Sequence, residues 1–324
     1  MKKNIAIVAG GDSSEVVVSL KSAAGLYSFM DKERYNIYIV TIVGKIWQVE
    51  WSDNEKIAID KNDFSFTRNG EKTNFDFAYI TIHGTPGENG ILQGYFELIG
   101  LPYSCCGVLA AAITFNKFTC NQYLKGFGVK VSESLVLRAG QRVSSEEVAQ
   151  KIGFPCFIKP NVGGSSFGVT KVKSVEQVQP AIEKAFVEGS EVMIEAFMSG
   201  IEITSGIYKT KTKTQVFPVT EVVSENEFFD YDAKYKGQVQ EITPARISAS
   251  LTERVQKLTS AIYDILGCKG IVRIDYIISE GDVINLLEVN TTPGMTATSF
   301  IPQQVAAAGL DIKDVMTDII ENEL

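Results

Sequence analysis

Two apolar stretches near the C-terminus constrain the fold most, because both carry charged residues in their interior. Residues 271–278 and 283–290 are rich in Ile and Val, and Gly281-Asp282 between them is typical of a two-residue hairpin turn. A turn of this kind fixes which residues of the two strands face each other. The sequence therefore predicts a β-hairpin whose register can be counted from the turn.

Counting from that turn brings four polar side chains together. Asp275 lies opposite Glu288, Arg273 lies opposite Asn290, and all four share one face because side chains alternate along a strand. Two facing carboxylates repel, and their burial in an apolar strand is costly, so the pair requires a cation. With only Cys268 as a softer ligand nearby, the oxygens of Asp275, Glu288 and Asn290 suit Mg²⁺. The alternative is that Arg273 neutralises the acids in a structural ion pair.

The composition excludes several classes of function. The chain has 324 residues, more than one hydrophobic core usually holds, so we expect two or three domains. It carries 31 basic and 39 acidic residues and no basic cluster, which argues against nucleic acid and against an anionic membrane surface as partners. A small-molecule substrate is the remaining expectation.

The N-terminus and the cysteines indicate a cytoplasmic protein. The N-terminus has only a short apolar run before a Gly-Gly pair, too short for a signal peptide or a membrane span. The five cysteines have neither zinc spacing nor the pattern of a disulfide framework. We therefore expect reduced cysteines in the core.

A strand-turn-helix unit opens the chain. Residues 4–9 are apolar and a Gly-Gly pair follows. Helical spacing is then shown by Val16, Leu20, Ala23 or Ala24, and Tyr27. Glu15 is expected in the first turn of this helix, where the helix dipole favours a carboxylate. Alternatively it points into a ligand crevice, because ligands of open α/β sheets bind at the carboxyl ends of the strands.

His83 is the only histidine and ends a further predicted strand. Strands are expected at 35–43 and 75–82, and the second runs into the glycine-rich loop 83–90. At that edge of an α/β sheet, His83 either contacts a ligand or serves only as a hydrogen-bonding group.

The next elements complete one domain and begin another. A helix near 92–99 and a short strand at 101–104 close a Rossmann-like unit. Helices containing Asn116-Lys117 follow, then a strand at 133–137. Ser144 and Glu147 have the spacing of a capping box and predict the start of another helix.

The segment 154–172 predicts an anion-binding loop between two strands. Lys159 ends the first strand, and the loop contains three glycines and two serines. Small residues let backbone amides approach a phosphate, which a lysine at the strand end can also reach. The spacing is not that of the Walker motif, and a Gly-Ser hairpin without a ligand is the alternative.

Two glutamates mark the following strands. Residues 191–207 are expected to form two strands around Gly200, with Glu195 and Glu202 near the joint. Their carboxylates either accept hydrogen bonds from an adenine amino group and ribose hydroxyls or are solvated edge charges. Residues 224–246 lack a strand or helix period, and a loop of this length in a compact enzyme is commonly a lid. An amphipathic helix at 250–266 and a helical C-terminus complete the chain.

Seven segments together resemble the ATP-grasp family and, within it, the D-alanine-D-alanine ligase family. They are GGDSSE, HGTPGENG, IKPNVGGSSFGV, EAFMSGIE, YDAKY, RID and LLEVNTTPGMTATS. Together they span essentially the whole chain in the family's order and are specific in combination, although each alone is weak. The resemblance implies a three-domain α/β (α+β) fold that holds ATP between its last two domains. The expected domains are an N-terminal Rossmann-like domain at 1–105, a central ATP-grasp domain at 106–197 and a C-terminal ATP-grasp domain at 198–324 that contains the lid and the metal hairpin.

The resemblance also implies roles for the nucleotide and metal residues. Two Mg²⁺ ions, or Mn²⁺ in their place, would be bound by Asp275, Glu288 and Asn290, in agreement with the hairpin argument. The residues expected to bind ATP are Lys117, Lys159, Glu195, Phe197, Met198 and Glu202.

The remaining matched residues are expected to act on the amino-acid substrates. Glu15 and His83 match positions near the first D-alanine, and Lys234 and Ser299 match contacts to the carboxylate of the second. The expected catalytic residues are Glu15, Ser165, Tyr235, Arg273 and Gly294. In the family pattern, Tyr235 and Ser165 hydrogen bond to close the lid on Glu15, and Arg273 with the Gly294 backbone N–H stabilises an oxyanion.

The implied activity is ATP-dependent ligation of two D-alanines through an acyl phosphate, which supplies the dipeptide of peptidoglycan. The resemblance also suggests a homodimer. Three positions depart from the usual pattern: Ala196 and Ile201 stand where basic residues are common, and Asn89 replaces an Asp.

Three alternatives remain at this stage. A related ATP-grasp ligase could use D-lactate or D-serine as the acceptor. A non-catalytic nucleotide-binding protein would be expected to lack some of the lysine, arginine and carboxylate residues that are all present here. A nicotinamide oxidoreductase ranks last, because GGDSSE lacks the GxGxxG spacing.

Overall fold

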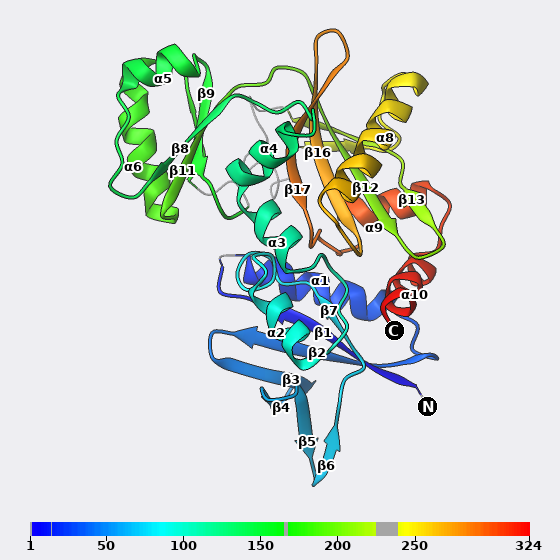
Figure 1. The fold of residues 1–324 in the computed structure, drawn as a ribbon. Coiled ribbons are helices and arrows are strands. Elements are labelled where there is room, and N and C mark those ends of the chain that lie inside the picture. Colours follow the sequence, from blue (N-terminus) through cyan, green and yellow to red (C-terminus); the bar gives the residue numbers. More distant parts are fainter. Residues whose placement is uncertain (1, 14, 165–167, 225–238) are drawn as a thin grey trace.

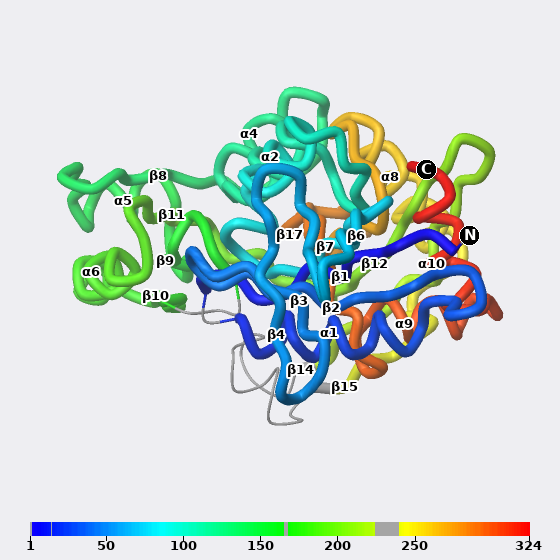
Figure 2. Tube along the Cα trace, turned by 90° about the horizontal axis from the view of Figure 1, so that it is seen from below, coloured from blue at the N-terminus to red at the C-terminus, as the bar shows by residue number. Residues whose placement is uncertain are grey.

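Three β-sheets follow one another along the chain (Figure 1). The computed structural model describes residues 2–13, 15–164, 168–224 and 239–324. Within these residues the first sheet has seven strands, the second four and the third six. The predicted α/β fold is therefore confirmed. In Figure 2 the second sheet and its helices lie at one end of the molecule, and α8 and α10 lie at the other.

The first sheet is parallel in its centre and antiparallel at one edge. Strand β1 (Lys3–Gly10) pairs in parallel with β2 (Tyr35–Val43) and β7 (Phe77–Ile80). The antiparallel strands beyond β2 are β3 (Ile46–Ser52), β4 (Glu55–Asp60), β5 (Ser65–Arg68) and β6 (Glu71–Thr73). The sequence analysis did not predict these four strands. Asn69-Gly70 was an available signal, since both residues have the positive φ of a tight hairpin turn, 52° and 82°.

Helices α1 (Val16–Phe29) and α2 (Ile91–Ile99) cover opposite faces of this sheet. The predicted apolar face of α1 is confirmed at Ala23, which is buried, and wrong at Leu20 and Tyr27, which are exposed. Beside Ala23, the buried face carries Ser19, Ser22 and Leu26. Ser19 bridges the backbone of two strands and Ser22 accepts a hydrogen bond from a distant loop, so small polar residues allow close approach where larger apolar ones would not fit.

The strand expected at 101–104 is reduced to one bridge between Ala78 and Tyr103. The five cysteines are free and four of them are buried, as expected for reduced core residues. Among the described residues, no helix is both long and apolar enough to span a membrane.

The second sheet is small, and helices cover one of its faces. Its order is β10 (Thr170–Val172), β9 (Cys156–Pro160), β11 (Glu191–Ala196) and β8 (Ser134–Arg138). The covering elements are α5 (Ser145–Lys151), a short 3-10 helix (Val175–Gln177) and α6 (Val178–Glu188). The predicted cap of α5 is confirmed, since the Glu147 backbone N–H donates to Ser144 Oγ at 3.1 Å.

The third sheet carries the predicted hairpin at one of its edges. The path is β15 (Val239–Ile242), β14 (Thr220–Ser224), β12 (Ile201–Lys209), β16 (Val272–Ser279) and β17 (Val283–Asn290), and β13 (Thr214–Val216) pairs with β12. One face packs against α8 (Ala249–Ile265), α3 (Val108–Phe115) and α4 (Lys117–Lys125). The other face packs against α9 (Phe300–Ala307), and α10 (Ile312–Glu323) continues this core to α1 of the first sheet.

The hairpin has the predicted pairs at the polar residues but not the predicted turn. Asp275 pairs with Glu288, and Arg273 pairs with Asn290. However, Ser279 pairs with Val283, so the turn has three residues rather than two. A bulge at residue 287 shifts the register back by one before the polar pairs are reached.

A glycine in α1 makes the closest helix contact with the C-terminal loop. A Cβ atom on Gly25 would lie 2.2 Å from the Met295 carbonyl oxygen, whereas one on Gly94 in α2 would meet only the tip of Val108 at 3.8 Å. Gly25 therefore brings α1 against the loop 291–299.

We expect Gly25→Ala to destabilise the protein by about 2 kcal/mol, because backbone must move to accommodate the methyl group. Gly94→Ala is the matched control and should stabilise by about 0.5–1 kcal/mol, since alanine favours a helix interior. Urea unfolding of both variants measures the difference. Similar stabilisation by the two substitutions would contradict the proposed close contact.

Candidate active site

Two adjoining cavities lie where the three sheets meet. The larger has a volume of about 700 Å³ and the smaller about 340 Å³. Both are lined by Glu15, Lys117, Arg273 and Glu288, and by the glycines at 163 and 164. The charged groups therefore form a wall shared by the two cavities, and a ligand in one can be within reach of a ligand in the other.

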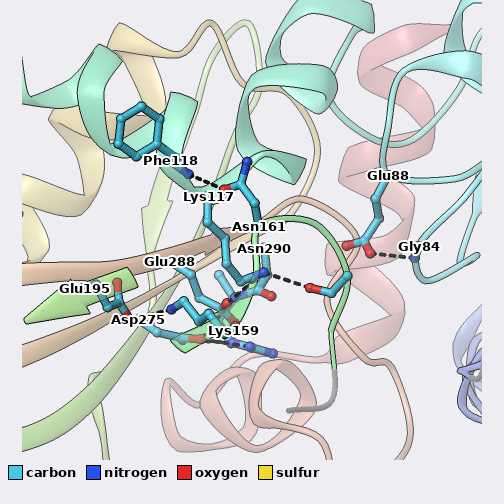
Figure 3. A network of polar contacts seen from close by, with 12 residues as sticks. Gly84, Glu88, Lys117, Phe118, Lys159, Asn161, Glu195, Asp275, Glu288 and Asn290 are labelled. Carbon is cyan, nitrogen blue, oxygen red and sulfur yellow. Dashed lines mark hydrogen bonds and ion pairs between the residues drawn. The ribbon is translucent and has the colours of Figure 1, made fainter. Parts of the chain in front are cut away.

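The hairpin supplies the centre of this wall (Figure 3). The Arg273 guanidinium donates from Nε and Nη2 to the two oxygens of Asp275, each at 2.9 Å. Asn290 Nδ2 donates to Asp275 Oδ2 at 3.0 Å. Burial opposes the charge of Arg273, but the nearby carboxylates, Asp275 first among them, outweigh burial and raise its pKa. The structural ion pair considered as an alternative is thus present, and it lies beside Glu288 in the same wall.

Lys117 connects the hairpin to the glycine-rich loop that follows β9. It is the first residue of α4, and its ammonium group donates to the Gly163 carbonyl oxygen at 2.7 Å. The same group lies 3.7 Å from Glu288 Oε2. A cation at this position faces both cavities and can contact an anionic group that enters between the loop and the hairpin.

The remaining residues that were predicted to bind ATP line the larger cavity. Lys159 on β9 forms a buried ion pair with Glu195 on the neighbouring strand β11. Sequence analysis had assigned this lysine to phosphates and this glutamate to adenine, and the structure brings the two together. The other predicted residues at this cavity are Phe197, Met198 and Glu202.

The residues predicted for the amino-acid substrates lie around the smaller cavity. They are Glu15, His83, Gly294 and Ser299. Glu15 is the N-cap residue of α1 rather than a first-turn residue, and its carboxylate lies against the Gly164 backbone, where an added Cβ would be 2.8 Å from Oε2. Ser299 Oγ accepts from the Thr296 backbone N–H at 3.1 Å, which ties the end of the loop to the start of α9.

Three predicted residues, Ser165, Lys234 and Tyr235, lie outside the described residues. The same holds for most of the segment 224–246 that was predicted as a lid, of which the ends form β14 and β15. Asn89, one of the departures from the family pattern, accepts a hydrogen bond from the backbone N–H at the start of α2 at 3.2 Å.

Glu88 is a site residue that the sequence analysis did not select. It lines the smaller cavity and accepts a hydrogen bond from the Gly84 backbone N–H at 2.7 Å (Figure 3). Burial raises the pKa of Glu88 to about 7, and the Glu15 carboxylate adds to this effect. The glycine-rich loop 83–90 indicated a ligand edge, but nothing in its sequence indicated that Glu88 would be buried there.

The oxygen-rich hairpin fits a divalent cation by its chemistry. Among the described residues no three acidic, His or Cys side chains are grouped as a metal cluster. The hairpin offers two carboxylates and one amide, which is the set that Mg²⁺ accepts when substrate phosphates and water complete its coordination. The donors present thus suit an ion that arrives with a phosphate ligand.

Glu88→Gln should weaken the dependence of stability on pH. Because the pKa of Glu88 is about 7 in the folded protein, against its usual 4.5, the folded state keeps a proton between these values that the unfolded chain loses. The free energy of unfolding therefore falls as pH rises through this window, by on the order of 3 kcal/mol.

Urea unfolding of the ligand-free protein from pH 4.5 to 7.5 measures this decline. Glu147→Gln, on the exposed surface of α5, is the control and should leave the profile unchanged. A profile for Glu88→Gln as steep as that of the wild type would refute the assignment.

Comparisons with known proteins agree with this geometry. Residues 4–106 match the family model described as D-ala D-ala ligase N-terminus, and residues 123–321 match that of the D-ala D-ala ligase C-terminus. A D-alanine--D-alanine ligase from Bacteroides fragilis is 74% identical over 323 residues, with 100% of each chain covered.

Two solved structures have the same fold over nearly their whole length. The VanG D-Ala:D-Ser ligase from Enterococcus faecalis matches with a TM-score of 0.89 and 28% identity, covering 100% of each chain. The D-alanine--D-alanine ligase from Bacillus anthracis complexed with ATP matches with a TM-score of 0.78 and 29% identity, covering 99% of this chain and 96% of the other. The chain belongs to the D-alanine-D-alanine ligase family.

Proposed function

We propose that the protein joins two molecules of D-alanine with consumption of ATP and so supplies the D-alanyl-D-alanine of peptidoglycan. The observation that carries this proposal is the charged wall shared by the two cavities. A nucleotide in the larger cavity would place its terminal phosphate at this wall, and an amino acid in the smaller cavity would place its carboxylate on the other side. This arrangement suits transfer of a phosphoryl group to a carboxylate.

Lys117 and Lys159 are suited to the first step, attack of the D-alanine carboxylate on the γ-phosphate of ATP. The ammonium group of Lys117 lies between the glycine-rich loop and the hairpin, where charge on the transferring group would develop. Glu15 and His83, at the smaller cavity, are suited to bind the first D-alanine. Glu195, Phe197, Met198 and Glu202 would surround the adenosine end.

Arg273 and Gly294 are suited to the second step. The amine of the second D-alanine attacks the acyl carbon, the C–N bond forms, and phosphate leaves with its bridging oxygen. Arg273 is held in one orientation by its two bonds to Asp275, so it can stabilise the oxyanion without reorganisation. The Gly294 backbone N–H and Ser299 line the same cavity on the acceptor side.

Asp275, Glu288 and Asn290 would hold two Mg²⁺ ions, or Mn²⁺, when ATP binds. The ions would offset charge on the phosphates. The protein contributes the position of these oxygens, which the hairpin register fixes.

The acceptor is the part of the proposal with a real alternative. The structural relative from Enterococcus faecalis is a D-Ala:D-Ser ligase, so the same fold serves another acceptor. We keep D-alanine because the relative that is 74% identical is a D-alanine--D-alanine ligase. D-serine and D-lactate are the rivals. Lys234, Ser165, Tyr235 and the lid at 224–246 belong to this proposal as the residues that would close over the acceptor.

The three-domain division and a cytoplasmic location complete the proposal. Separate hydrophobic cores support one domain for residues 1–105 and another for the small second sheet. The helices α3 and α4 fall within the proposed range 106–197, yet they share their core with the third sheet. No nucleic-acid or membrane partner is proposed.

We also propose a homodimer that pairs through α2 and α3. Ile91 and Leu98 each lie about one turn from Gly94, which faces Val108 of α3, so periodicity places them on the face toward that helix. Leu98 is 89% exposed and Leu109 of α3 is 72% exposed. Large apolar side chains gathered on adjacent helices support a second copy as the occupant.

Product analysis tests the activity directly. Purified protein with ATP and Mg²⁺ should release phosphate with D-alanine and form a dipeptide that mass spectrometry identifies as D-alanyl-D-alanine, and L-alanine should give none. Products with D-serine or D-lactate in competition with D-alanine would move the assignment to the rival acceptor.

In the same assay Glu288→Gln should lower turnover at least about a hundredfold, since loss of a group that merely supports a metal ligand already costs 10- to 100-fold. Its fold should survive, because glutamine has the same length. Glu147→Gln is the control. Wild-type turnover in Glu288→Gln would remove Glu288 from the proposed metal site.

The charge-introducing variant Leu98→Glu/Leu109→Glu tests the dimer. Light scattering after gel filtration should give about twice the chain mass of 35.5 kDa for the wild type and a single chain mass for this variant. Val187 on α6 is 82% exposed and distant from α2, so Val187→Glu is the matched control and should remain dimeric. A monomeric wild type would overturn the proposal.

A further inference from the structure

Helix α4 packs against the third sheet but forms hydrogen bonds with the second. Its buried residues Cys120 and Leu124 lie in the core of the third sheet. Its first turn, however, is bound to the ends of β9 and β11 in the second sheet. The helix therefore bridges the two sheets that form the larger cavity.

Asn161, the residue after β9, supplies the bonds to this first turn. The Lys117 backbone N–H donates to the Asn161 carbonyl oxygen at 3.1 Å. The Phe118 backbone N–H donates to Asn161 Oδ1 at 2.8 Å (Figure 3). The first N–H groups of a helix have no partner within it, so a residue distant in sequence completes this helix start.

Glu191, the first residue of β11, fixes the orientation of Asn161. Asn161 Nδ2 donates to Glu191 Oε2 at 2.7 Å, and the same oxygen accepts from Asn116 Nδ2 at 3.0 Å. Asn116 is the N-cap of α4, and its own Oδ1 accepts from the Thr119 backbone N–H at 2.9 Å. The amide of Asn161 is the main reason that the pKa of Glu191 is lowered, so the carboxylate is charged and accepts strongly.

We propose that Asn161 and Glu191 are positioning residues. They hold the start of α4, and with it the ammonium group of Lys117, against the glycine-rich loop that follows β9. Asn161 is 1% exposed, so its side chain has no solvent to replace a lost partner. Two residues further along the chain, Gly163 accepts from the ammonium group. The same short segment thus fixes both ends of Lys117, its backbone N–H and its charged group.

This inference rests on the proposed role of Lys117 in ATP binding. Arg138 provides a comparison within the same network. It binds the other oxygen of Glu191 at 2.9 Å, but its side chain is 70% exposed. Loss of an exposed ion pair has little effect, so only the bonds toward the helix should matter for Lys117.

The first experiment measures binding of ATP with Mg²⁺ by calorimetry, in the absence of D-alanine. Asn161→Ala should weaken binding about tenfold, as expected for a buried donor left without its acceptor. Arg138→Ala should bind within about twofold of the wild type. In a Lys117→Met background, Asn161→Ala should cause no more than about a twofold further loss, because it acts through Lys117.

The second experiment exchanges the hydrogen-bonding groups. Asn161→Asp keeps the acceptor for the helix but sets two carboxylates together, so it should weaken ATP binding as Asn161→Ala does. The double variant Asn161→Asp/Glu191→Gln restores a donor and an acceptor in the opposite sense, and its binding should recover to within about threefold of the wild type. Thermal unfolding of each variant measures the accompanying loss of stability.

The outcomes separate the inference from the proposed function. If Asn161→Ala lowers affinity equally with and without Lys117, or if the exchanged pair does not recover, Asn161 has only a structural role and the inference is overturned. Wild-type affinity in Asn161→Ala overturns it as well. If Lys117→Met alone binds ATP as the wild type does, the role of Lys117 in the proposed function fails, and the inference fails with it.

Discussion

The buried ion pair between Arg273 and Asp275 is the interaction on which the arrangement of the site depends. Charges in an apolar hairpin are costly unless every one of them is paired and hydrogen bonded. Here the guanidinium takes both oxygens of Asp275, and Asn290 adds a third bond. A register slip of one residue would turn these groups to the other face, so the cost of burying them specifies a single pairing of the two strands. The position of Glu288 follows from that pairing.

The sequence analysis reached the correct polar pairs through two errors that cancel. It expected a two-residue turn at Gly281-Asp282, but the turn has three residues, and a bulge at residue 287 compensates. Hydrophobic alternation located the strands, because periodicity is a local property of the chain. Hydrophobic alternation could not predict the bulge, since a bulge depends on how the third sheet twists and packs. The pairs were recoverable because both carboxylates had to share one face.

Long-range contacts explain the other differences between prediction and structure. The face of α1 was predicted to include Leu20 and Tyr27, yet the helix buries serines beside Ala23 because a distant loop comes within backbone contact of Gly25. Asn161 likewise lies between Lys159 and the glycines from which a phosphate site was predicted, while its own partners are in α4 and β11. Residues that carry a charge or a motif can be selected from a sequence. Residues that connect them cannot, because their partners are defined only after folding.

The charge of the larger cavity, to which the hairpin contributes, affects the form in which a nucleotide can bind there. Its described lining contains three basic side chains, Lys117, Lys159 and Arg273, against seven carboxylates. Each of these bases already has a carboxylate partner: Asp275 for Arg273, Glu195 for Lys159 and Glu288 for Lys117. A triphosphate entering alone would therefore meet a surplus of negative charge, and repulsion at close range is severe where water is excluded. Divalent cations bound to the phosphates would reverse this balance, and the facing oxygens of Asp275 and Glu288 would then attract the nucleotide complex instead of repelling it. By charge alone, the acidic wall would favour a metal-bound nucleotide over the free one.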